Sequence, residues 1–140
     1  MKFWAAAEVF KPAYAALSQI RQSVEPFLNR ALAASSLATL QFELRYVPIV
    51  MPENIRARYP ARSELRKEEG VYLCAPALDY HVFVEGVFEE QLQEYLRGIA
   101  LSAPQFAGLG ASPQQIEEFK AILAGAVDRI IAERPDQTRH

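Results

Sequence analysis

The feature that most constrains the fold is an alternation of apolar and polar residues in the middle of the chain. Across residues 39–50, large apolar side chains take every second position, at Leu40, Phe42, Leu44 and Tyr46. A period of two predicts a strand with one buried and one wet face. Such a strand is typical of an antiparallel sheet. Pro48 cannot donate a ladder hydrogen bond, so this end of the strand is predicted to be a sheet edge or a bulge.

Helical periodicity dominates the rest of the chain. From Pro12 apolar residues recur at three- and four-residue steps, which predicts a helix that ends at Ser35-Ser36, and Pro26 should kink or split it near residues 23–25. A second helix is predicted from Phe88 onward. Ser112-Pro-Gln-Gln is typical of a capped helix start, which predicts a third helix over residues 113–133.

The remaining segments are shorter and less regular. They are predicted as a strand at 3–10, a loop at 51–70 that ends in a hairpin turn at 68–70, a strand at 71–74, a strand or a short helix capped by Asp79 at 79–84, and a loop at 103–110. For residues 79–84 we prefer the helix. The fold class expected from this order is α+β, with a small antiparallel sheet packed against several helices. We expect one domain over residues 1–140, with 136–140 as a frayed tail.

Composition excludes several classes of protein. Hydrophobic residues make up 51% of the 140 residues and charged residues 23%, which favours a globular chain over a disordered one. A formal net charge of -2 offers no general attraction to nucleic acid. No apolar stretch suits a membrane span, and Glu8 and Lys11 interrupt any signal-peptide core. With one cysteine, we expect a protein of the reducing cytoplasm.

One segment combines residue types used in catalysis. Cys74, Asp79 and His81 lie within eight residues and could supply a nucleophile, an orienting group and a base. We prefer a structural interpretation, with a buried cysteine, a capping aspartate and a surface histidine. The chain has only one other histidine, His140, so no zinc site is expected, and Gly108-Leu-Gly110 lacks the pattern of a phosphate-binding loop. We therefore expect no enzyme, no metal and no cofactor.

The charge distribution is more informative than any motif. Residues 79–94 carry five acids and no lysine or arginine, whereas residues 45–67 carry six bases and two acids. The two segments could be solvated faces that pair with each other or with neighbours, or the acidic one could dock a basic partner. Phe83 and Phe88 are expected in the core, and Tyr80 at the surface. The candidate partner-binding residues are Asp79, Tyr80, Glu85, Glu89, Glu90 and Glu94.

Four short segments carry a resemblance to a known family. They are Arg45-Tyr-Val-Pro-Ile-Val-Met-Pro52, Arg58-Tyr-Pro-Ala-Arg-Ser63, and Cys74-Ala-Pro-Ala-Leu-Asp-Tyr80 with Phe83-Val-Glu-Gly86. Over roughly residues 40–125 the chain resembles small immunity proteins of bacterial polymorphic-toxin systems. The resemblance implies a cytosolic, non-catalytic protein that binds one cognate toxin domain and blocks its active site or substrate path. It assigns no contact residues.

Two alternatives stay open. The chain could be a structural or regulatory module that forms a homodimer through its C-terminal helix. The outward residues of that helix are polar apart from alanines, which suits solvent better than a large interface: Gln114, Glu117, Glu118, Lys120, Ala121, Ala124, Asp128 and Arg129. The chain could also be a small enzyme that depends on Cys74. The oligomeric state is left as monomer or homodimer.

Overall fold

The structure is a computed structural model that describes residues 1–5, 8–9, 11–52, 62–66 and 70–133. Its strands are β1 (Lys2–Ala5), β2 (Glu8–Val9), β3 (Glu43–Tyr46), β4 (Ile49–Met51), β5 (Arg62–Arg66), β6 (Val71–Ala75) and β7 (Ala77–Asp79). Its α-helices are α1 (Lys11–Ala33), α3 (Tyr80–Glu85), α4 (Phe88–Ala100) and α5 (Pro113–Ala132). Two 3-10 helices, η1 (Ser36–Thr39) and η3 (Ala103–Leu109), complete the described elements.

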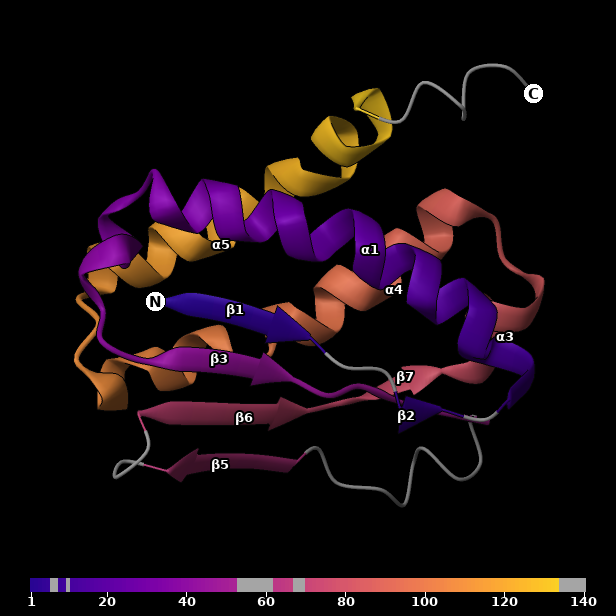
Figure 1. Ribbon diagram of the computed structural model, residues 1–140, viewed down its shortest axis with the longest axis horizontal. Coiled ribbons are helices and arrows are strands. Elements are labelled where there is room, and N and C mark those ends of the chain that lie inside the picture. Colours follow the sequence, from indigo (N-terminus) through magenta and orange to yellow (C-terminus); the bar gives the residue numbers. More distant parts are fainter. Residues whose placement is uncertain (6–7, 10, 53–61, 67–69, 134–140) are drawn as a thin grey trace.

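The sheet is mainly parallel, so the prediction of an antiparallel sheet is wrong. The order of the larger sheet is β1-β3-β6-β5, and Figure 1 shows these strands stacked in that order. β1, β3 and β6 run parallel, as do β2, β4 and β7, and only β5 pairs antiparallel with β6. The helix α1 explains the parallel pairing, because it carries the chain back to the starting end of the sheet before β3 begins.

The central strands are interrupted at two neighbouring prolines. Pro48 separates β3 from β4, and Pro76 separates β6 from β7. The backbone continues across both gaps, since the Val47 N–H donates to the Cys74 carbonyl oxygen and the Ile49 N–H donates to the Pro76 carbonyl oxygen. The predicted alternation in β3 holds, with Leu44 and Tyr46 buried. However, β3 pairs on both sides, so Pro48 marks a break in a central strand and not a sheet edge.

Several helix and turn predictions are confirmed, and several short elements were missed. The cap of α3, the start of α4 and α5 agree with the sequence, and Gly70 with φ 65° precedes β6 in a hairpin with β5. The turn residues Glu68 and Glu69, and the expected tail at 136–140, lie outside the described residues. Residues 3–5 and 8–9 are strand as predicted. The α1 helix passes Pro26 without the expected split. β5, β7 and η3 were not predicted, because β5 is a polar strand at the sheet edge and the other two are short.

The helices pack on the sheet face that carries Leu44 and Tyr46. Tyr46 donates from its hydroxyl to the Tyr95 carbonyl oxygen at 3.0 Å, which ties β3 to α4. At the same crossing, a Cβ on Gly98 would lie 2.8 Å from a Leu78 methyl carbon and would also overlap the Tyr46 hydroxyl. Glycine therefore lets α4 approach the sheet closely.

The opposite face of the sheet and its β1 edge are less apolar. Trp4 is 40% exposed there, and the Arg45 guanidinium lies 5.4 Å from the centre of its ring. At the outer edge of β1, the Phe3 N–H donates to Asn29 Oδ1 at 3.1 Å, and Arg21 Nη1 donates to the Ala5 carbonyl oxygen at 3.5 Å. Side chains of α1 thus satisfy backbone groups that no strand pairs. No helix in the described part of the chain has the length and apolarity needed to cross a membrane.

Candidate functional site

The turn between α3 and α4 presents apolar and acidic side chains together to solvent. Val84 is 44% exposed and Val87 is 63% exposed, and Glu85, Glu89 and Glu90 beside them are also exposed. We call these five residues the acidic corner. Large exposed apolar side chains within a group of like charges are unusual on a surface that contacts only water. The acidic corner is therefore the best candidate for a partner-binding surface among the described residues.

Backbone hydrogen bonds hold the acidic corner in one conformation. Glu90 accepts from the Val87 N–H at 3.0 Å through Oε1, which caps the start of α4. Valine has no side-chain acceptor, so only this half of a capping box can form. Gln91 Nε2 donates to the Gly86 carbonyl oxygen at 3.0 Å. A Cβ on Gly86 would lie 2.5 Å from the Val82 carbonyl oxygen, so the close turn requires glycine.

Two of the predicted contact residues, Asp79 and Glu94, make hydrogen bonds that stabilise the fold. Glu94 accepts from the Asp79 N–H at 2.9 Å and forms an ion pair with Arg97 at 2.7 Å. The side chain of Glu94 is only 12% exposed. Its hydrogen bond raises the pKa of Arg97 above the ordinary value. Asp79 Oδ1 accepts from the His81 N–H at 3.0 Å and so caps α3.

The aromatic residues of this segment differ in part from expectation. Tyr80 was expected at the surface, but it is half-buried and packs against the hydrophobic core. Phe83 is buried as predicted, and Phe88 is partly buried against the same core. Val87 was not among the predicted partner-binding residues, although its position outside the apolar stripe of α4 indicates that its side chain is exposed. Of the six predicted residues, the structure leaves Glu85, Glu89 and Glu90 together at the surface.

Of the six cations in residues 45–67, the structure describes the side chain of Arg45 alone, and its carboxylate neighbour lies outside residues 79–94. Glu94 pairs with Arg97 of its own helix. Arg45 lies 3.4 Å from Glu43 on its own strand. Arg62 and Arg66 belong to β5, at the edge of the sheet, and Arg56, Arg58 and Lys67 lie outside the described residues.

Cys74, Asp79 and His81 are not arranged as a catalytic triad. Cys74 is buried, and desolvation raises the pKa of its thiol to about 12, against a smaller lowering by a hydrogen bond with Ser102. The chain runs from Cys74 to Asp79 through β6, Pro76 and β7, so five residue steps of nearly extended backbone, about 16 Å, separate the two residues. Asp79 is occupied by the cap of α3, and His81 is exposed to solvent. A thiol that stays protonated at neutral pH is a poor nucleophile.

In the described ranges, no group of three or more histidine, cysteine, aspartate or glutamate side chains is placed to hold a metal ion.

Comparison with known proteins identifies no relative. No protein-family model, curated protein or solved structure matches the chain.

Proposed function

We propose that the chain is an immunity protein, which neutralises a cognate toxin domain by binding it and performs no chemistry itself. The observation that carries the proposal is the acidic corner, where Glu85, Glu89 and Glu90 surround the exposed side chains of Val84 and Val87. The corner is held by hydrogen bonds, so a partner can bind it with little further loss of conformational entropy.

The chemistry of the corner indicates the kind of surface it fits. Three carboxylates favour a basic partner surface, because complementary potentials speed association and reject wrong partners. A toxin that acts on a nucleic acid needs a basic substrate groove. The two valines add apolar contact area at the centre of the charged residues, as in the interior of many binding interfaces. The corner would then occupy the groove and exclude the substrate.

A double charge reversal tests this proposal. Glu85→Lys with Glu89→Lys changes two side chains that have no capping role, whereas Glu90 is left in place because it caps α4. The proposal places the partner in the neighbouring open reading frame, and the toxin domain from that frame is produced separately for the measurement. We expect the association rate at low salt to fall at least about tenfold, because electrostatic steering is lost. Stopped-flow fluorescence measures this rate.

A matched control separates local from overall charge. Glu117→Lys with Asp128→Lys makes the same change in net charge on the solvent side of α5. We expect this control to associate with nearly the rate of the unmodified chain. Equal association rates for the unmodified chain and the corner variant would refute the proposed contact.

The exposed face of α5 bears on the alternative of a homodimer. Its outward residues are small or polar, and no large apolar side chain of this face is exposed in the described helix. An obligate dimer interface is usually more apolar than this. Light scattering of the purified chain tests the alternative, and a stable dimer mass would favour it.

A further inference from the structure

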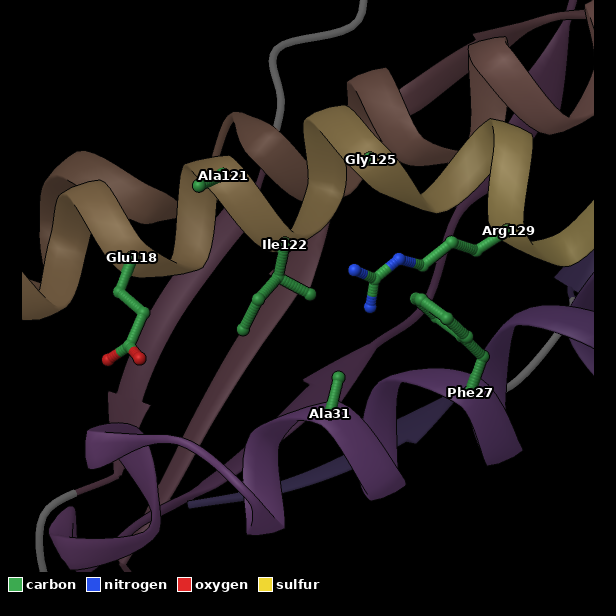
Figure 2. Close-up of a pocket in the computed structure, with 7 residues that line it drawn as sticks. All are labelled: Phe27, Ala31, Glu118, Ala121, Ile122, Gly125 and Arg129. Carbon is green, nitrogen blue, oxygen red and sulfur yellow. The ribbon is translucent and has the colours of Figure 1, made fainter.

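A cavity lies between α1 and α5, whereas the acidic corner lies at the turn between α3 and α4. The cavity has a volume of about 230 Å³, and it is lined by Phe27, Ala31, Glu118, Ala121, Ile122, Gly125 and Arg129. Figure 2 shows Ile122 from α5 and Ala31 and Phe27 from α1 facing the space between the two helices. Five of its seven lining residues are apolar or glycine, and a charged residue stands toward each end.

Small residues keep this space open. A Cβ added to Gly125 would meet no atom within 4 Å. Glycine is less favourable than alanine inside a helix, and an unfilled gap between helices forfeits packing contacts. Stability alone would favour a larger side chain at this position.

The two charged residues at the ends of the cavity are not equivalent. Glu118 accepts a hydrogen bond from the Ser36 hydroxyl of η1, which holds its carboxylate at the end of the cavity away from Arg129. Arg129 has no carboxylate partner among the residues that the structure describes. In Figure 2 its guanidinium extends between Ile122 and Phe27 toward the cavity. A cation beside apolar walls favours an anion that carries an apolar group.

A second groove, on the other side of α5, provides a comparison within the same molecule. It has a volume of about 310 Å³ and lies between α4 and α5, where Ala124 and Val127 form part of its wall. Its two cations are already paired, Arg97 with Glu94 and Lys120 with Glu117. The cavity between α1 and α5 is therefore distinguished by the cation of Arg129, which is unpaired within the described part of the chain, because the second groove is at least as large but its cations are paired.

We propose that the cavity between α1 and α5 binds a small apolar carboxylate, with its apolar body against Ile122 and Ala31 and its carboxylate on Arg129. A cavity of roughly 150 Å³ in another protein takes up benzene, so the larger space here can hold one ring with a carboxylate. This site is separate from the acidic corner and does not depend on the immunity function.

Benzoate is the probe for this site, followed by ¹H–¹⁵N NMR of the full chain. We expect millimolar benzoate to shift the amide signals of Ala31, Ile122 and Gly125, and benzyl alcohol, which has no charge, to bind more weakly. Arg129→Gln should weaken benzoate binding about threefold or more, the range of an exposed ion pair. Gly125→Leu should fill the cavity and abolish binding, whereas Ala124→Leu, in the second groove, should not.

The outcomes separate clearly. No shift with benzoate, equal binding of benzoate and benzyl alcohol, or unchanged binding in Arg129→Gln would overturn the proposal. Shifts that cluster on the α4 side of α5 would do the same. Arg129 is exposed, so its variant tests the site even if Gly125→Leu does not fold.

Discussion

The last turns of α4 lie against the sheet, whereas its first turn projects into solvent. At the sheet end Tyr95 and Ile99 are fully buried, and Gly98 contacts Tyr46 and Leu78. At the solvent end Glu89 and Glu90 are exposed. Between the two, Glu94 binds the backbone of β7 and the side chain of Arg97. The comparison shows that acids only one turn apart on a helix differ in availability, because each turn meets different surroundings.

The strongest test of the sheet end is Gly98→Ala. We expect a loss of about 3 kcal/mol in the free energy of unfolding, because the new Cβ would press on Leu78, on Pro76 and on the Tyr46 hydroxyl. Urea denaturation followed by circular dichroism measures it. The control is Gly125→Ala, where an added Cβ meets nothing within 4 Å, and the helix should gain up to about 1 kcal/mol. Similar losses of stability in both variants would refute the claim that the close contact of α4 with the sheet requires glycine at position 98.

The middle of the helix is tested by Glu94→Ala. We expect a loss of about 2 kcal/mol, because the Asp79 N–H loses a charged acceptor and Arg97 loses its partner. Glu94→Gln keeps an acceptor for the Asp79 N–H and should cost clearly less. If both variants were as stable as the unmodified chain, Glu94 would contribute no more to stability than the exposed acids at the solvent end.

The free energy of unfolding at alkaline pH tests whether the Cys74 thiol on β6 is buried. The thiol of Cys74 has a pKa raised from 9.0 to about 12, so the folded chain holds this proton while the unfolded chain releases it. The stabilisation is complete below pH 9 and is lost as the pH rises toward 12, at up to about 1.4 kcal/mol per pH unit. The difference in unfolding free energy between the unmodified chain and Cys74→Ala, measured at pH 8 and 10, isolates this effect. An unchanged difference would mean that the thiol is not desolvated.

The first turn of α4 should respond less. Glu90→Ala removes the acceptor for the Val87 N–H, and we expect a loss of about 1 kcal/mol, as for other helix caps. The melting temperature by circular dichroism should fall slightly. Glu90→Gln keeps an acceptor and serves as the control, so an equal fall in both variants would show that the cap contributes nothing.

The smallest effect on stability is expected at the exposed carboxylates. Glu85→Gln with Glu89→Gln should change the free energy of unfolding by less than about 0.5 kcal/mol, because neither side chain is buried. Thermal denaturation checks this. A large loss would place these residues with Glu94 as structural groups and would weaken the case for a binding surface.

Local features of this fold could be predicted from the sequence, and its long-range features could not. The start of α5 follows from Ser112 and Gln115, and α3 from Asp79, because each cap lies within three residues of its partner. The parallel direction of β3 depends on where α1 returns the chain, whereas the alternation within β3 reports one buried and one wetter face and does not fix the direction of the neighbouring strands. The role of Glu94 was missed for the same reason, since its partner at Asp79 lies on another element. The exposed carboxylates of the acidic corner were found because short-range charge patterns are local.

The hydrogen bonds at the outer edge of β1 have a consequence for the chain at high concentration. An edge strand with free backbone groups can recruit a strand from another molecule and begin aggregation. Here an incoming strand would have to displace Asn29 from the Phe3 N–H and Arg21 from the Ala5 carbonyl oxygen. The helix that covers the core therefore also closes this side of the sheet to strand addition, so the chain should resist polymerisation through β1 even at high concentration.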